Sequence, residues 1–405
     1  MWTTVSADVA SVVVTGVGVL CAFGRGLPAL SQGLRAGRSA ITPLSAFDAG
    51  GLPLALAAQV LEELAEHPDF QDDRKASLAL AAAWDATRGV DVSGAGVWMG
   101  TGLSSVTPRE LAEDAAPSLV DGRIDRARIH ADVSPDRVAP RRHLPERVTG
   151  LLASELGCTG PQQTSFSACA AGALAIANGA RAIRRGEVDL AVCGGHDSMI
   201  HPLGVLSFIV LGALSEGACR PFDRHRSGFV IGEGAAVLLL EREDRARARG
   251  ATIYARLLGS GSSVDAHNVT APHPEGRGAA LSMQRALREA GLDTVDHVNA
   301  HGTGTPLGDQ VEARAIRSVL GDSVPVSSIK GAIGHCIAAA GAVEAVACIA
   351  ALHEGFSPGT SGCEEPEAMG IRVQQAPRQE RLDTVLSNSF GFGGQNATLI
   401  FGRAG

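Results

Sequence analysis

The chain has 405 residues, 45% of them hydrophobic and 19% charged, which is enough to bury a large core as one big domain or as two fused halves. Its formal net charge of −8 argues against nucleic acid as a partner. Eight cysteines occur without a CxxC pair or regular spacing, and no signal-peptide layout opens the chain, so we expect reduced thiols in a cytoplasmic protein.

Apolar strands and helical segments alternate in chain order. In the first part, strands are predicted at 11–18, 96–99, 163–167, 188–194 and 229–241, and helices at 28–34, 75–87, 170–185 and 242–250. The order then starts again, with strands at 252–259, 295–300, 324–328, 384–389 and 396–401 and helices at 276–290, 308–320 and 334–353. Residues 103–150, richer in Pro, Asp and Arg, are expected to form loops and short helices. The alternation predicts an α/β fold in which helices cover the sheet faces.

The repeated order of elements predicts two stacked α/β halves, residues 1–250 and 251–405, although no internal sequence repeat is evident. Continuous apolar runs such as residues 12–14 predict strands that are buried on both faces. The most membrane-like stretch, 332–352, contains His335 and Glu344 and is built of Ala and Gly more than Leu. We therefore expect a buried helix there and no membrane association.

Lys330 is one of only two lysines in a chain that otherwise uses arginine. A lysine supplies a compact point charge with three donors, whereas arginine supplies a broad planar fork. Lys330 stands in an Ala/Gly-rich segment five residues before His335, with Glu344 further on. Because the chain uses lysine so rarely, a lysine at this position indicates that an ammonium group is needed beside that histidine.

Cys169 follows a predicted strand and opens an Ala-rich helix. A thiol at a helix N-terminus faces the positive end of the helix dipole, so we expect its pKa to be lowered and a backbone N–H to be available for a developing oxyanion. Small neighbours leave room for a thioester. The alternative is an ordinary buried cysteine, as most of the eight are expected to be.

Two histidines lie where their rings can be aimed into a crevice. His301 follows a predicted strand in a Gly/Thr-rich turn, and His335 is expected at the start of a helix. Neutral imidazoles there can donate an N–H to a thioester carbonyl. Alternatives are satisfied core histidines or a zinc site with Cys169 and Cys336, but the spacing matches no zinc pattern, so no metal is predicted.

A glycine-rich turn closes the chain's last strand pair. Residues 391–394 read Gly-Phe-Gly-Gly, and Phe392 between glycines could gate an acyl pocket, although a simple hairpin connection is the plainer interpretation. No GxxxxGK[ST] occurs, and no GxGxxG opens a helix after a strand, so nucleotide cofactors are not indicated. Arginine pairs at 141–142 and 184–185 could be solvated surface or a docking site for an acidic carrier protein.

Several stretches together resemble one family. They are Ser-Ala-Cys at 167–169, Arg-Pro-Phe-Asp at 220–223, Gly-Phe-Val-Ile-Gly-Glu-Gly at 228–234, Val-Asn-Ala-His-Gly-Thr-Gly-Thr at 298–305, Ser-Ser-Ile-Lys at 327–330, Gly-His at 334–335, and Asn-Ser-Phe-Gly-Phe-Gly-Gly at 388–394. In this order they resemble the elongating β-ketoacyl-acyl carrier protein synthases over almost the whole chain. The resemblance implies the thiolase fold, duplicated halves in five αβαβα layers, usually as a dimer.

The resemblance also implies residue roles. Cys169 would take an acyl group from a carrier-protein thioester, and His301 and His335 would hold the malonyl thioester and promote loss of CO2. The backbone amides of Cys169 and Phe392 would form the oxyanion hole. Supporting roles are implied for Lys330 in the polar network, Glu344 beside it, and Thr303 and Thr305 against the pantetheine arm. No cofactor is implied beyond the phosphopantetheine of the acyl carrier protein.

The chain departs from the usual family pattern at Ala170-Ala171, Ser227, Ile329, Ile337-Ala338 and Gln395. These departures remove no catalytic group, but they favour a specialised type II polyketide-like pathway over housekeeping fatty-acid elongation. The partner is expected to be a second copy or a chain-length-factor-like subunit. A chain-length factor would lack Cys169, a thiolase would carry a cysteine at Phe392, and an initiating synthase would replace one histidine by asparagine. A modular polyketide domain is disfavoured because the chain ends shortly after its last strand.

Overall fold

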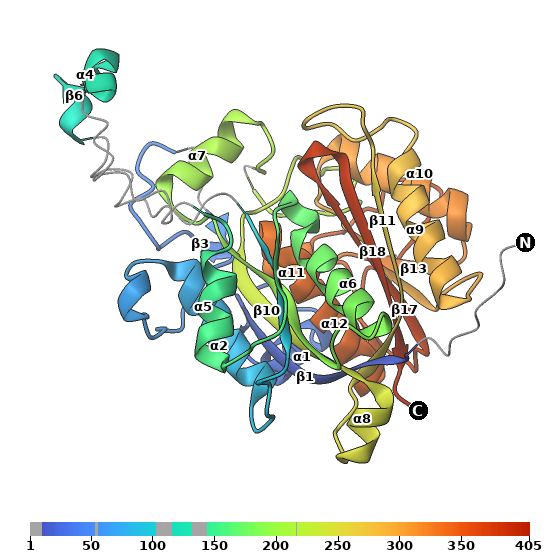
Figure 1. The fold of residues 1–405 in the computed structure, drawn as a ribbon. Coiled ribbons are helices and arrows are strands. Elements are labelled where there is room, and N and C mark those ends of the chain that lie inside the picture. The colour runs from blue at the N-terminus through green and yellow to red at the C-terminus, as the bar shows by residue number, and fades with distance from the viewer. Residues whose placement is uncertain (1–9, 53–55, 103–115, 132–143, 216) are drawn as a thin grey trace, which may run out of the picture.

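The computed structural model describes residues 10–52, 56–102, 116–131, 144–215 and 217–405 (Figure 1). The main strands are β1 (Val12–Cys21), β5 (Gly96–Thr101), β8 (Gln162–Ser165), β9 (Leu190–Ser198), β10 (Glu233–Arg242), β11 (Ala255–Val264), β12 (His297–Asn299), β13 (Pro325–Ser327), β17 (Thr384–Gly391) and β18 (Gln395–Arg403). Short strands are β2 (Gly24–Arg25), β3 (Thr42–Pro43), β4 (Leu56–Ala57), β6 (Leu119–Val120), β7 (Arg123–Ile124), β14 (Phe356–Ser357), β15 (Arg372–Val373) and β16 (Arg378–Gln379).

The α-helices are α1 (Leu27–Arg35), α2 (Arg74–Thr87), α4 (Arg126–Ala131), α5 (Arg147–Leu156), α6 (Ala171–Arg184), α7 (Pro202–Val210), α8 (Glu243–Ala248), α9 (Arg277–Ala290), α10 (Pro306–Leu320), α11 (Lys330–Ile333) and α12 (Ala340–Glu354). Most predicted elements are found within a few residues of these bounds. Three helices, α5, α7 and the short α11, are not among the helices predicted by range. The arginine pair at 141–142 lies outside the described residues, and Arg184 is used in an ion pair with Glu289.

The sheet repeats one topology twice. Its order is β8-β5-β9-β10-β1 in the first half and β13-β12-β17-β18-β11 in the second, with β15 added at the edge. In each set the first three strands are parallel and the last two are antiparallel. The sets join where β1 pairs with β11 at Val13 and Val14. The order of elements therefore recurs in space even though no sequence repeat is evident.

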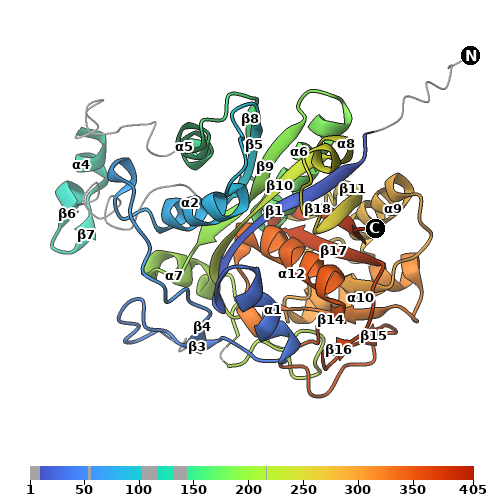
Figure 2. The same cartoon turned by 90° about the horizontal axis from the view of Figure 1, so that it is seen from below.

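Helices and strands form five layers. Helices α2 and α5 cover the outer face of the first strand set, α9 and α10 cover that of the second, and α6 and α12 lie between the sets (Figure 2). The two central helices approach closely because Gly172 and Gly341 lack side chains: a Cβ on Gly172 would lie 3.0 Å from the Ala338 carbonyl oxygen. This arrangement brings the N-terminal end of α6 against the turn that precedes α12.

The apolar stretch near residue 340 is a core helix. Within the part of the chain that the structure describes, one helix, Ile337–Glu354, is long and apolar enough to cross a membrane, and 89% of it is buried inside the protein. It packs on strands of both sets and on α6. The prediction of a buried helix is confirmed, although α12 itself begins at Ala340, later than the predicted residue 334.

Candidate active site

Cys169 lies in a strained turn directly before helix α6. The 3-10 turn Ala168–Ala170 carries it directly into α6, and Ala168 has φ +45°, a left-handed conformation that costs non-glycine residues about 1–3 kcal/mol. Gly391 packs against this turn: a Cβ there would lie 2.9 Å from the Ser167 carbonyl oxygen and 3.2 Å from the Cys169 nitrogen. The thiol is thus held at a fixed position beside the β17–β18 connection.

Both predicted histidines come from loops that follow strands or short helices. His301 stands two residues after β12, as predicted. His335 is not at a helix start: it lies between α11 and the 3-10 turn Ile337–Ala339. Its amide donates to the Val230 carbonyl at 2.8 Å, and its carbonyl accepts from Gly232 at 2.9 Å. Because Gly334 has φ +66°, the chain leaves α11 and pairs with this extended segment before it becomes helical again.

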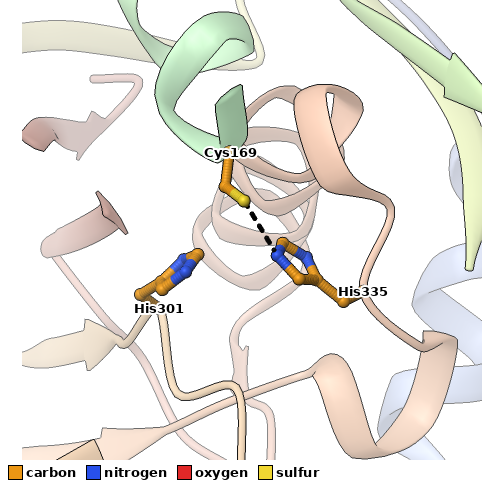
Figure 3. A group of neighbouring side chains, drawn as sticks. All are labelled: Cys169, His301 and His335. Carbon is orange, nitrogen blue, oxygen red and sulfur yellow. Dashed lines mark hydrogen bonds between the residues drawn. The ribbon is translucent and has the colours of Figure 1, made fainter. Parts of the chain in front are cut away.

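The thiol and the two imidazoles converge (Figure 3). His335 Nε2 lies 3.1 Å from Cys169 Sγ, and the rings of His301 and His335 meet edge to face with centroids 5.3 Å apart. One ligand atom from each of the three residues lies within 4.8 Å of the others. A metal ion could bridge such a distance despite the atypical spacing in sequence, so the absence of a metal stays a prediction.

Lys330 lies between His301 and a buried acid. Its Nζ lies 3.4 Å from His301 Nδ1 and forms an ion pair with the Glu344 carboxylate from α12. Lys330 is fully buried and Glu344 nearly so. The structure therefore brings together every polar group that the sequence singled out around Cys169.

A cavity of about 260 Å³ opens onto these groups. Thr303, Thr305 and Phe392 line it, as does the thiol itself, and the two threonine hydroxyls lie 3.0 Å apart. The backbone amide of Phe392, in the turn after β17, lowers the pKa of the Cys169 thiol. Cys169, the two histidines, the two threonines and Phe392 thus share one cavity, whereas Lys330 and Glu344 lie behind its wall.

The β-ketoacyl synthase N-terminal domain matches residues 10–246, and the β-ketoacyl synthase C-terminal domain matches residues 254–364. The chain belongs to the β-ketoacyl synthase family. This ketosynthase, an acyltransferase, is 35% identical to the 3-oxoacyl-[acyl-carrier-protein] synthase 2 of Coxiella burnetii over 97% of this chain and 98% of that protein. The chain also has the thiolase fold that the family resemblance predicted.

Two solved structures are similar over nearly the full length. The ishigamide ketosynthase/chain length factor has a TM-score of 0.87 and 33% identity, covering 98% of this chain and 100% of that chain. A type II polyketide synthase acyl-carrier protein in complex with its ketosynthase bound to the hexaketide has a TM-score of 0.84 and 27% identity, with the same coverage. The ketosynthase thus resembles both a 3-oxoacyl-[acyl-carrier-protein] synthase and the ketosynthase of a type II polyketide synthase.

Burial sets the protonation of the histidines in this ketosynthase. It lowers the pKa of both His301 and His335 well below the usual value, and the Lys330 ammonium lowers both further. Both rings are therefore neutral near pH 7, each with one N–H to donate. This agrees with the neutral donors that the sequence predicted.

The sequence predicted a lowered pKa for the Cys169 thiol, and this prediction is wrong for the resting site. Burial raises the pKa of Cys169 to about 12, against the lowering effects of Lys330 and the Phe392 amide. Desolvation of the thiolate outweighs the position at the start of α6. The nucleophile therefore rests as a thiol, and its proton must leave as it attacks; His335 Nε2 is the nearest acceptor.

Two acids on α10 were missed by sequence reasoning. Glu312 accepts the amides of His301 and Gly302 at 2.8 and 2.7 Å, and Asp309 accepts the Gly304 amide at 3.0 Å. Burial raises the pKa of each carboxyl to about 7. They fix the backbone of the His301 loop. The sequence does contain a pattern that could have indicated them, because acids three residues apart lie on the same face of a helix. The same pattern is also typical of a solvent-exposed helix face.

Proposed function

We propose that this ketosynthase catalyses a decarboxylative Claisen condensation between an acyl group on Cys169 and malonyl-acyl carrier protein, giving 3-oxoacyl-acyl carrier protein. The observation that supports it is the convergence of one thiol, two neutral imidazoles and one backbone donor in a single cavity. Catalysis of this kind needs donors placed where charge develops on oxygen, and no strong base, because loss of CO2 itself generates the carbanion.

The first half-reaction is acyl transfer to sulfur. Cys169 Sγ attacks the thioester carbonyl of the acyl carrier protein while its proton passes to His335 Nε2, 3.1 Å away. The tetrahedral oxygen accepts from the amides of Cys169 and Phe392. Collapse breaks the bond to the carrier thiol, which leaves with the proton, so a thioester on Cys169 replaces a thioester on the carrier.

The second half-reaction is condensation. Imidazole N–H groups of His301 and His335 donate to the malonyl thioester oxygen, the carbon–carbon bond to the carboxylate breaks, and CO2 leaves. The resulting carbanion attacks the acyl carbonyl on Cys169. Lys330 and Glu344 hold the His301 side of this network. Collapse of the tetrahedral intermediate breaks the bond to Cys169 Sγ and releases the 3-oxoacyl product, and the thiolate takes up one proton from water.

We place the enzyme in the cytoplasm, acting on the phosphopantetheine arm of an acyl carrier protein and assembled as a dimer with a second copy or with a chain-length-factor-like subunit. Thr303 and Thr305 at the cavity wall would contact that arm. The ketosynthase/chain length factor similarity supports the assembly, and the complex of a ketosynthase with its acyl-carrier protein supports the substrate class. No cofactor beyond the carrier's own arm is needed.

A specialised type II polyketide-like pathway is the pathway that we propose. It is supported by the departures at Ala170-Ala171 and Gln395 and by the polyketide ketosynthases among the similar structures. Housekeeping fatty-acid elongation remains the second candidate, favoured by full-length similarity to 3-oxoacyl-[acyl-carrier-protein] synthase 2. A role as a non-catalytic partner subunit is disfavoured by the thiol at residue 169.

Intact-protein mass spectrometry after incubation with acyl carrier proteins bearing different acyl groups tests the function. We expect one acyl group to be retained per chain, and none on Cys169→Ala. Cys348→Ala is the matched control, because that thiol is equally buried but does not line the cavity. Malonyl-acyl carrier protein is then added: a 3-oxoacyl product that extends over several cycles supports the polyketide-like pathway, a single extension of saturated acyl groups supports fatty-acid elongation, and no acylation contradicts the function.

A further inference from the structure

A buried ion pair adjoins the site without lining the cavity. Lys75, the second residue of α2, places its Nζ 3.3 Å from Oδ1 of Asp197 near the end of β9. The side chains are 10% and 1% exposed. Removing two charges from water costs several kcal/mol per ion, and replacing such a pair with apolar groups of similar shape is often neutral or stabilising. Stability alone therefore does not account for the pair.

The other carboxylate oxygen of Asp197 reaches a strained turn. Oδ2 accepts from the Ala338 amide at 3.1 Å, while Oδ1 accepts from the Ser198 amide at 2.9 Å. Ala338 belongs to the 3-10 turn that Ile337 opens with φ +47°, a conformation that β-branched residues rarely adopt. Strain of this kind costs about 1–3 kcal/mol and persists only where the surroundings enforce it. Asp197 supplies such a restraint on the amide next to Ile337.

The Ile337 turn forms part of the wall around the nucleophile. It begins two residues after His335, and its Ile337 side chain lines the cavity together with Cys169. The turn also contacts the Ala168–Ala170 turn that carries the thiol. The 3.1 Å contact between His335 Nε2 and Cys169 Sγ is therefore held between two backbone segments in unfavourable conformations, and any relaxation of the Ile337 turn would move the imidazole.

The charge of Asp197 also reaches the nucleophile. After burial and the Lys330 ammonium, Asp197 is the next influence on the Cys169 thiol, and it raises the pKa. Among the described residues, Lys75 is the cation paired with Asp197. Burial first, and then Lys75, lower the pKa of the adjacent His196 to about 3, so that imidazole is neutral and does not compete for the carboxylate. Lys75 thus balances a negative charge that would otherwise disfavour the thiolate.

We propose that Lys75 and Asp197 are a positioning pair for the condensation: Asp197 holds the Ile337 turn that sets His335 against Cys169, and Lys75 balances the charge of that carboxylate. The inference rests on the proposed use of Cys169 and His335 in condensation. Neither member of the pair touches substrate, since neither lines the cavity. Asp197 acts through the backbone amide of residue 338, and Lys75 acts through the charge of Asp197.

Three variants separate the two parts of the pair. Asp197→Ala removes the acceptor for the Ala338 amide, and we expect kcat for malonyl decarboxylation and condensation to fall about 100-fold, the cost of misplacing a reacting group by about 1 Å. The KM for the carrier protein should not change, because docking is untouched. Lys75→Met leaves the carboxylate uncompensated and should lower kcat. Lys75→Met with Asp197→Asn keeps an acceptor without either charge, and its kcat should return to within about threefold of the unmodified enzyme.

Arg184→Met is the matched control. Arg184 is as buried as Lys75, with an 11% exposed side chain, and its 2.6 Å ion pair with Glu289 lies at the far end of α6 from Cys169. It should reduce thermal stability while leaving kcat unchanged. The unmodified enzyme is assayed first, and its failure to condense would count against the proposed function and not against the pair.

An Asp197→Ala protein with native near-ultraviolet circular dichroism and unmodified kcat would overturn the positioning role. If that variant does not fold, the Lys75→Met series decides: recovery of kcat in the double variant supports the pair, and a kcat that stays low contradicts it.

Discussion

At the residue scale, the site combines a nucleophile that rests protonated with imidazoles that rest neutral. The same burial causes both effects, because desolvation disfavours thiolate and imidazolium alike. Lys330 acts on all three groups: its charge stabilises the thiolate and destabilises the protonated rings. One buried ammonium therefore favours the ionised nucleophile and the neutral donors together, which explains why a chain with so few lysines places one there.

The Lys330 effect is testable on the thiol. Of the eight cysteines, Cys169 is the one that lines the cavity, so iodoacetamide should label it first, at a rate that rises about tenfold per pH unit up to pH 10. The double variant Lys330→Met, Glu344→Gln removes the ammonium without leaving an unpaired buried acid. Labelling at pH 8 should then slow about three- to tenfold. Peptide mass spectrometry identifies the site; first labelling elsewhere, or a faster double variant, would contradict this account.

His335 should affect the two half-reactions unequally. In His335→Ala, malonyl decarboxylation loses a donor to the developing oxyanion and should fall about 100- to 1,000-fold. Acylation of Cys169 should retain part of its rate, because the Phe392 amide still faces the sulfur. The measurements are CO2 release and intact mass on the same preparation. Equal loss of both activities would mean that the role assigned to His335 is wrong.

At the element scale, sequence reasoning found strands and amphipathic helices and missed features that depend on packing. Helix α7 was missed because its apolar run has no clear polar face, and Leu203, Leu206 and Val210 are in fact exposed on it. The sequence predicts a helix start at His335, because nothing local reveals that Gly334 turns the chain so that His335 pairs with residue 231. Cys169, Lys330 and the histidines were found from residue type and order, whereas Lys75 and Glu312 were not, because their partners are distant in sequence or are backbone amides.

A histidine in β12 should make stability depend on pH. Burial lowers the pKa of His297 to about 4, and its Nε2 lies 2.8 Å from the Ser327 hydroxyl on β13. Above pH 6.5 both folded and unfolded chains keep this ring neutral. As the pH falls toward 4, the unfolded chain alone takes up the proton, and stability declines by about 1.4 kcal/mol per pH unit.

His297→Gln keeps a polar group and removes this titration. Between pH 7 and pH 5 the unmodified enzyme should lose about 2 kcal/mol more unfolding free energy than the variant, measured by urea unfolding at both pH values. All other groups titrate in both proteins and cancel in the comparison. An identical loss in the two proteins would show that His297 takes up its proton as readily in the folded chain as in the unfolded chain, which contradicts the lowered pKa.

At the scale of the whole molecule, the two strand sets repeat one topology, yet they contribute different groups. The first set carries the thiol on its β8–α6 connection, and the second carries both histidines, the lysine and the glycine-rich turn. The site lies where the sets face each other, with α6 and α12 between them. The division near residue 250 stays a prediction, but the repeated strand order gives it a structural basis that the sequence could not supply.

The free edge at β8 makes a prediction about assembly. Within the described residues, β8 ends the sheet with no further strand beside it, and Phe166, directly after it, is 52% exposed. An open strand edge with an aromatic beside it is a template for pairing with another chain. We expect light scattering after gel filtration to give twice the 41.5 kDa of one chain, or a complex with a partner subunit, and Phe166→Glu to give monomers.

Trp84→Glu on α2 is the control, since Trp84 is similarly exposed, at 43%, and its helix packs on β1, β10 and β9. It should leave the assembly intact. Because Phe166 precedes Cys169 by three residues, the monomeric variant should also lose condensation, as the turn that carries the thiol would lose its support. A Phe166→Glu protein that remains a dimer would place the interface on another face of the molecule.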